Sequence, residues 1–304
     1  MKVLQNSGGL RQQQKLPTII FLAPAVFMLL WIYGFPLIFN IAISLTDWTG
    51  ITWNMNFIGV KNYGTIFTER AIFTVLGNNM KFLIGTVAIQ NILALWLSTW
   101  LVRNFRGRNF FRSIIFMPLL MPVVAVAMVF SIIFDPINGP ITYIAGALGW
   151  DWLGSLRFLA NPNIVMNTLI MVNVWQWTGW NMVIYLAGHQ AIPQELYEAC
   201  AIDGTTGWQK FRHITLPMLA PAITTNIVLS SMGALKVFDL PYALTGGGPG
   251  YYSETLTMSI VRNMGTLNKA GLAAAMSILL AAIIISITIV QNRVLSKQEE
   301  AMRE

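Results

Sequence analysis

The chain has few charged residues and almost no cysteine. Only 10% of its 304 residues are charged and 55% are hydrophobic, whereas about 25% charged residues is usual in a soluble domain. The single cysteine, Cys200, excludes an internal disulfide and fits no metal-ligand cluster. The composition therefore indicates a membrane protein in which neither a metal site nor thiol redox chemistry is predicted.

Two further features are missing, and both absences shape the predicted fold. The apolar runs lack the short alternation of apolar and polar residues that a membrane β-barrel needs. No A-x-A-like cleavage site follows the first run, which is far longer than the apolar core of a cleavable signal, so we expect that run to be retained. The sequence predicts an all-α membrane protein with six spans, since a bilayer of about 30 Å requires about 20 residues per helix. The expected spans cover roughly residues 18–45, 76–101, 113–134, 164–188, 218–240 and 270–291.

The basic residues predict how the spans are oriented. Placing the N-terminus inside puts most Lys and Arg residues, including those of "RNFRGRNFFR", in the cytoplasm, and this asymmetry predicts an N-in, C-in topology. Topology thereby accounts for most of the net charge of +7, and no nucleic-acid binding is predicted. The expected organisation is a cytoplasmic tail over residues 1–17, one membrane domain over 18–292 and a second cytoplasmic tail over 293–304.

One cytoplasmic loop, residues 189–217, is long and acidic, against the trend of its own side. Pro193 suits a first helical position, and Gly204 after Asp203 suits a helix stop, so a short helix is predicted over 193–203.

A second short helical segment is expected over residues 206–213, after which Pro217 opens the fifth span. Such a pair of helices would present Ala199, Cys200 and Ala201 as a compact knob that another protein could approach closely. A solvated loop with ordinary caps explains the composition equally well.

The residues of this loop also resemble a known motif. Glu198-Ala199-Cys200, then Asp203-Gly204, then Ile214-x-Leu216-Pro217 resembles the "EAA" loop of permease subunits in binding-protein-dependent ATP-binding-cassette importers. Cys200 stands where alanine is usual, and its similarly small side chain should be tolerated. The stretches "FDLPYALTGGGP" and "GLAAAMS" extend the resemblance to the carbohydrate-uptake, maltose-type branch over nearly the whole chain.

The resemblance implies a type I importer permease fold and a set of partners. These are a second similar permease, two cytoplasmic ATPase subunits and an extracellular solute-binding protein, in a multi-pass complex of the cytoplasmic (inner) membrane. The chain itself would be no enzyme and would bind no cofactor, because ATP and Mg²⁺ belong to the ATPase. The loop would form coupling helices that dock on the ATPase, and the docking residues implied are Glu195, Glu198, Ala199, Cys200, Asp203, Gly204, Ile214, Leu216 and Pro217.

The fourth span offers a polar and aromatic face near the middle of the membrane. A sugar presents hydroxyls and apolar faces, so a site for it should combine amides with aromatic rings. At 100° per residue one face of this span carries Asn173, Gln176, Trp177, Trp180 and Ile184, whereas Trp175 points to the opposite side. An interfacial aromatic belt is the alternative, but the central position of these residues favours a translocation path, and the family resemblance implies the same.

The fifth and third spans add residues to this path. Lys236 and Asp239 are spaced i, i+3, so on one helix they would form either a structural ion pair or a sugar contact. By resemblance, Gly233, Lys236 and Val237 align with the stretch that touches sugar in maltose-type permeases, and Leu119 and Val123 do so more weakly.

The predicted function is a permease subunit that imports a carbohydrate, with an oligosaccharide expected from the maltose-type resemblance. An ion- or proton-coupled secondary transporter is the main alternative, and it would need membrane carboxylates and inverted repeats. Asp239 alone gives that alternative thin support. A membrane-embedded enzyme would need a cluster of His, Asp or Cys side chains, for which the sequence offers no candidate.

Overall fold

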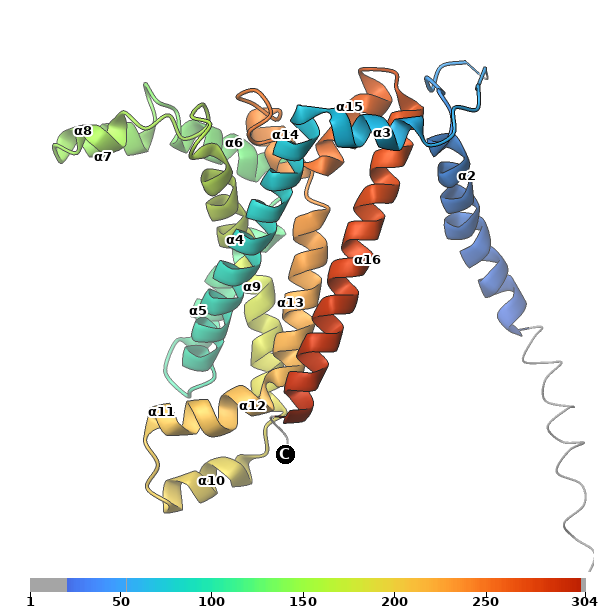
Figure 1. Cartoon of the computed structure of the whole chain (residues 1–304). Helices are drawn as coiled ribbons and strands as arrows, with labels where there is room; N and C mark the ends of the chain where they lie inside the picture. Colours follow the sequence, from blue (N-terminus) through green and yellow to red (C-terminus); the bar gives the residue numbers. More distant parts are fainter. Residues whose placement is uncertain (1–20, 53, 302–304) are drawn as a thin grey trace, which may run out of the picture. The chain divides into compact units, whose positions relative to one another are not determined.

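The computed structural model describes residues 21–52 and 54–301, and the described chain is predominantly helical (Figure 1). No strand occurs within these two ranges. The expected N-terminal tail, 1–17, lies outside the described residues. The chain divides into two compact units, one formed by Met1–Thr65 and Asn263–Ile278 and the other by Ile66–Arg262 and Leu279–Glu304.

The first unit contains the first apolar run. It forms a helix over Phe21–Ser44 that includes a π-helical turn, η1 (Leu30–Gly34), followed by α2 (Phe35–Ser44). Asn62, in α3 (Lys61–Thr68), donates from Nδ2 to the carbonyl oxygens of Ser44 and Thr46, both at 2.8 Å. This side chain satisfies carbonyls at the end of α2 that have no partner within the helix.

The second unit is built on three helices that lie side by side: α4 (Arg70–Leu101), α9 (Val165–Gln190) and α13 (Ala220–Leu235) (Figure 1). The C-terminal halves of α4 and α9 share a hydrophobic core, formed by Ala94 and Leu101 of α4 with Met182, Tyr185 and Leu186 of α9. These side chains pack closely, and their many van der Waals contacts hold α9 against α4.

The third span is broken rather than continuous over 113–134 as predicted. It consists of α5 (Arg108–Phe116), the 3₁₀ turn η2 (Met117–Leu120) and α6 (Val123–Ile133), with a bend of 97° at the break. Pro122 explains the break, because proline lacks the N–H that would continue the helix and forces the preceding residue, Met121, into an extended conformation with ψ 132°.

The fifth span is also shorter than the predicted 218–240. The helical run Gly207–Met218 meets α13 at a bend of 65°, so Pro217 lies near the end of the preceding run instead of opening the span. At its other end α13 stops at Leu235, and a new helix, α14 (Asp239–Thr245), begins after a break.

Within residues 21–52 and 54–301, three helices are long and apolar enough to cross a membrane, and two bent pairs raise this number to five if each pair is one span. They are Phe21–Ser44, Arg70–Leu101 and Ala270–Lys297, the last within α16 (Ala270–Ala301). Helix α9 has 26 residues but is too polar to be counted among them. The remaining short helices are α7 (Pro140–Ala147), α8 (Asp151–Gly154) and α15 (Leu256–Gly265).

Candidate functional site

A cavity of about 230 Å³ lies among α4, α9, α13 and the start of α14. It brings together every residue of the predicted substrate path except Leu119, which is half-buried elsewhere in η2. Its lining mixes amides, aromatic rings and one charge of each sign: Gln90, Val123, Asn173, Gln176, Trp177, Trp180, Asn181, Leu229, Ser230, Gly233, Ala234, Lys236, Val237, Phe238, Asp239 and Leu240. This composition is the one expected for a site that binds a polyhydroxylated molecule.

The amides of the cavity hold one another in place. Gln90 of α4 donates from Nε2 to Asn173 Oδ1 at 2.9 Å, and Asn181 Nδ2 donates to Ser230 Oγ at 3.0 Å. These bonds link α9 to both neighbouring helices and fix the orientation of the amide groups that face the cavity.

Gln176 differs from the other amides because half of its amide group is free. Its side chain is 1% exposed, and Nε2 donates to the Met121 carbonyl oxygen at 3.2 Å, at the break of the third span. Its Oε1 is buried and has no hydrogen-bond partner among the described residues. A buried acceptor of this kind normally has a partner, and a hydroxyl of a bound molecule would supply one.

The tryptophans of α9 divide as predicted between the cavity and the opposite face. Trp177 and Trp180 line the cavity and remain 39% and 44% exposed. Trp175 is absent from the lining and packs edge-on against Phe130 of α6, with ring centroids 5.2 Å apart. Ile184, predicted on the cavity face, is not part of the lining, because it lies further along α9 towards the cytoplasmic end.

The break between α13 and α14 forms one wall of the cavity and separates Lys236 from Asp239. The two residues were predicted on one helix at i, i+3, but α13 ends before Lys236 and α14 begins at Asp239. No ion pair joins them in the described part of the chain. Lys236 follows the negative end of one helix dipole and Asp239 lies at the positive end of the next, which stabilises each charge separately.

Sequence reasoning missed several lining residues. Gln90 lies in a span that reads as continuously apolar, and Asn181 lies beside the face that was singled out, next to Trp180. The available signal was an amide inside an apolar run, since polar groups in membrane helices usually face a protein interior or a cavity.

The cytoplasmic loop forms two helical segments beyond the ends of α9 and α13 (Figure 1). The first, α10 (Gln194–Ile202), follows Pro193 directly and is one residue shorter at each end than predicted. Gly204 follows it with φ +66°, a conformation that glycine adopts without strain.

The second helical segment is longer than the predicted 206–213. It begins with α11 (Gly207–Lys210), where Thr206 and Gln209 form a reciprocal capping box. It continues through the π-helical turn η3 (Phe211–Thr215) into α12 (Leu216–Met218). Ile214, Leu216 and Pro217 are half-buried in this continuation, between the exposed part of the loop and the start of α13.

Side-chain contacts tie the two segments together. The hydroxyl groups of Tyr197 and Thr215 lie 3.2 Å apart, and the Lys210 ammonium lies 5.4 Å from the centre of the Tyr197 ring. On α10, Gln194 Nε2 donates to Glu198 Oε1 at 2.9 Å. The first two contacts hold the two segments against each other, and the third stabilises α10 itself.

The surface of this loop is acidic and apolar at once. Glu195, Glu198, Ala199, Asp203 and Gly204, all predicted as docking residues, are exposed. Cys200 is buried, with 6% of its surface exposed, so the knob expected from Ala199, Cys200 and Ala201 is formed by the two alanines alone.

The loop also exposes large apolar side chains that sequence reasoning did not select, and two of them are mostly exposed. Ile202 is 86% exposed and Trp208 is 68% exposed. Exposed apolar groups beside charged ones are typical of a protein interface.

Comparison with known proteins identifies the family. Residues 90–299 match the family described as "Binding-protein-dependent transport system inner membrane component". The chain belongs to this family. The match includes α9, α13, the cavity they line and the whole cytoplasmic loop, so the family resemblance seen in the sequence is confirmed.

Relatives of this permease cover almost the whole chain. The probable ABC transporter permease protein YurN of Bacillus subtilis is 33% identical over 285 residues, which are 92% of this chain and 96% of that protein. The probable starch degradation products transport system permease protein AmyD of Thermoanaerobacterium thermosulfurigenes is 30% identical over 283 residues, 93% of this chain and 95% of the relative.

A solved structure shares the fold of the permease. It is the crystal structure of a bacterial ABC transporter involved in the import of the acidic polysaccharide alginate, with a TM-score of 0.81, 21% identity, and coverage of 94% of this chain and 96% of that one. Family membership makes this chain a transport subunit and not an enzyme, and it favours the ATP-driven importer over the ion-coupled transporter.

Proposed function

We propose that the permease imports a carbohydrate, most simply an oligosaccharide, through the cavity on α9. The observation that carries this proposal is the composition of the cavity, in which amides alternate with Trp177 and Trp180 around the free Oε1 of Gln176. Amides bind hydroxyl groups, and indole rings pack against the apolar face of a sugar ring. The starch-product permease and the alginate importer among its relatives support the same substrate class.

We propose six spans with both termini in the cytoplasm. Five of them are the three apolar helices and the two bent pairs found in the described part of the chain. Helix α9 is the sixth. Its Asn173, Gln176 and Asn181 face the cavity and neighbouring helices, so these amides are not exposed to lipid. The asymmetry of the Lys and Arg residues supports the N-in, C-in orientation.

We infer that the cytoplasmic loop docks on an ATPase subunit, and that the assembled importer contains two such subunits. The exposed Glu198, Asp203, Ile202 and Trp208 offer charge and apolar area for such an interface. ATP and Mg²⁺ would bind to the ATPase, and a second permease and an extracellular binding protein would complete the importer. One structural relative is a complex with a periplasmic protein bound to an alginate pentasaccharide, which supports delivery by a binding protein.

The test is stimulation of ATP hydrolysis in the reconstituted complex. Vesicles containing the permease and its partners would be given binding protein loaded with members of a panel of mono- and oligosaccharides. We expect at least one oligosaccharide to stimulate hydrolysis and to be transported. Stimulation by an amino acid or a metal ion, with no response to any sugar, would contradict the proposal.

A further inference from the structure

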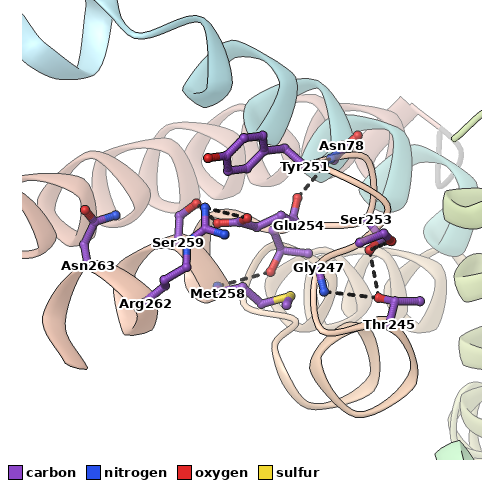
Figure 2. A network of polar contacts seen from close by, with 12 residues as sticks. Asn78, Thr245, Gly247, Tyr251, Ser253, Glu254, Met258, Ser259, Arg262 and Asn263 are labelled. Carbon is purple, nitrogen blue, oxygen red and sulfur yellow. Dashed lines mark hydrogen bonds and ion pairs between the residues drawn. The ribbon is translucent and has the colours of Figure 1, made fainter. Parts of the chain in front are cut away.

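Two neighbouring amides of α4 attach the loop that follows α14. Asn78 donates from Nδ2 to the carbonyl oxygens of Tyr251 at 2.7 Å and Glu254 at 3.0 Å (Figure 2). Asn79 accepts the backbone N–H of Leu256 at its Oδ1, at 2.7 Å. Both amides are buried, so the loop is fixed to α4 at both ends of a six-residue stretch.

The inside of this loop is held by an ion pair between a buried carboxylate, Glu254, and a partly exposed guanidinium, Arg262. Glu254 is 1% exposed, and its carboxylate lies 2.8 Å from Arg262 and also accepts a hydrogen bond from Ser259 (Figure 2). Burial raises the pKa of Glu254, and the Ser259 bond and the Arg262 charge oppose that rise. Arg262 in turn lies 4.8 Å from the centre of the Tyr251 ring. Loss of the contact with Arg262 would leave the buried Glu254 carboxylate without a compensating charge. The ion pair therefore stabilises this conformation of the loop.

The other side of the same loop binds the cavity wall. Thr255 donates from Oγ1 to the Val237 carbonyl oxygen at 2.8 Å, and Asn79 donates from Nδ2 to the Leu235 carbonyl oxygen at 3.1 Å. Both carbonyls belong to the break between α13 and α14, where a helix end leaves carbonyls without an intrahelical partner. Lys236, which lines the cavity, is the residue between them.

Asn79 therefore contacts the loop with one end of its amide and the cavity wall with the other. A hydrogen bond that only satisfies a buried carbonyl could come from any nearby donor. Here both donors reach the break from the loop or from the side chain that also holds the loop. A displacement of the loop must consequently be accompanied by a displacement of the backbone around Lys236, or these bonds are lost.

We propose that Asn79 and Thr255 are positioning residues that transmit the position of the loop over residues 251–256 to the cavity wall at Lys236. The inference rests on the proposed function, because it concerns how an event at this loop reaches the sugar site. Beyond the proposed function, the inference names the two hydrogen bonds that connect the loop to the cavity wall: Thr255 to Val237 and Asn79 to Leu235.

The experiment compares Thr255→Val with Thr255→Ser. The first keeps the shape but loses both the bond to Val237 and the weaker bond, 3.3 Å long, that Thr255 Oγ1 accepts from the Met258 N–H at the start of α15. The second keeps the hydroxyl and both bonds, and Asn79→Asp removes the bond from Asn79 to Leu235 without touching Met258. The matched control is Thr86→Val in α4, because Thr86 is equally buried and its Oγ1 donates only to carbonyls of its own helix. The full complex in vesicles is titrated with sugar-loaded binding protein, and ATP hydrolysis is expressed per assembled complex.

We expect Thr255→Val to lower the maximal stimulated rate roughly fivefold, a small coupling effect between linked sites. For Thr255→Val, the concentration of binding protein that gives half of the maximal hydrolysis rate should stay within about twofold of wild type. The maximal rates of Thr255→Ser and Thr86→Val should also stay within about twofold of wild type, because neither change removes the bond between Thr255 and Val237. Combining Asn79→Leu with Thr255→Val should cost less than the product of the two single effects, because both act on one link.

Two results would overturn the inference. One is a maximal rate for assembled Thr255→Val equal to that of Thr255→Ser, and the other is an equal loss in Thr86→Val. If Thr255→Val does not assemble, Asn79→Asp provides the test. This variant keeps the oxygen that accepts the Leu256 N–H and loses the N–H₂ group that donates to the Leu235 carbonyl. A maximal rate equal to that of wild type would then overturn the inference. A wild-type complex that responds to no sugar overturns the proposed function and the inference with it, whereas a responsive wild type with an unaffected Thr255→Val overturns the inference alone.

Discussion

The cavity on α9 and the loop over residues 189–217 are two candidate functional regions built in opposite ways. In the cavity, polar groups are buried and hold one another through bonds such as Gln90 to Asn173. In the loop, the charged and apolar groups are exposed, and the internal contacts, such as Tyr197 to Thr215, only stiffen the support beneath them. A buried polar group is costly without a partner, so the cavity ties its amides to one another and leaves an acceptor such as Gln176 Oε1 for a ligand, whereas a docking surface needs its groups exposed. The cavity should therefore be sensitive to shape and the loop to surface chemistry.

The largest effect is expected from a methyl group added between α9 and α5. A Cβ at Gly179 would lie 2.4 Å from the Ile115 carbonyl oxygen and 2.9 Å from the Phe116 Cα, both backbone atoms that cannot rotate away. We expect Gly179→Ala to destabilise the permease by about 3 kcal/mol, at the upper end of overpacking effects. Thermal unfolding of the purified complex measures this. Gly207→Ala in the loop, where a Cβ meets nothing within 4 Å, is the control, and equal midpoints for the two variants would contradict the comparison.

The next effect should appear at the docking surface. Ile202→Ser removes an apolar group that is 86% exposed and should leave folding unchanged. If Ile202 is central to the ATPase interface, its loss should weaken ATPase binding about thirtyfold, the effect of a typical hot spot of about 2 kcal/mol. The measurement is co-purification of the ATPase at graded salt and detergent. Ile137→Ser, at an outside residue that is 79% exposed, should bind the ATPase normally; retention of the ATPase by both variants would remove Ile202 from the interface.

A smaller effect separates the two faces of α9. Trp177→Ala should raise the sugar concentration for half-maximal transport about tenfold, because it removes an aromatic contact of about 1.4 kcal/mol. Trp175→Ala removes a ring that packs against Phe130, so it should lower thermal stability and leave sugar dependence unchanged. Transport assays over a range of sugar concentrations distinguish them. The division of the face is wrong if Trp175→Ala changes the sugar dependence more than Trp177→Ala does.

The smallest effect concerns the two charges at the helix break. Exchanging Lys236 and Asp239 places each charge at the unfavourable end of a helix dipole, a cost of about 0.3 to 1 kcal/mol per site. We expect transport to fall about threefold, an effect of about 0.7 kcal/mol. Lys236→Gln alone tests whether the charge itself contributes. Full transport by the exchanged variant would instead indicate that the two residues form an ion pair during the transport cycle.

The cytoplasmic loop was predictable to within a residue or two at its first helix because its signals are local. Pro193, Gly204 and the acidic residues between them determine a helix and its end through their own backbone preferences. The inward orientation of Cys200 was not predictable, because it depends on the segment that packs against α10. The cavity face of α9 was found from helical periodicity, which is also a local property.

The spans broken at Pro122 and after Leu235 were predicted as continuous, since apolarity measures suitability for the membrane and not helical continuity. At the first break, Pro122 was a local signal for an interruption of the helix. At the second break no local residue demanded an interruption, and Lys236 and Asp239 fell on opposite sides of it.

The sequence by itself determined the membrane class, the family and the residue types of both regions, because composition, motif spacing and helical period are properties of consecutive residues. Only the tertiary structure decided which of those residues meet. Asn78 and Asn79 are separated from the loop they hold by more than 170 positions. The amide of Gln176 is oriented by its bond to the carbonyl of Met121, more than 50 positions away, and this bond leaves its Oε1 free. Contacts between distant segments depend on how whole helices pack, and no pattern along one helix specifies its neighbours.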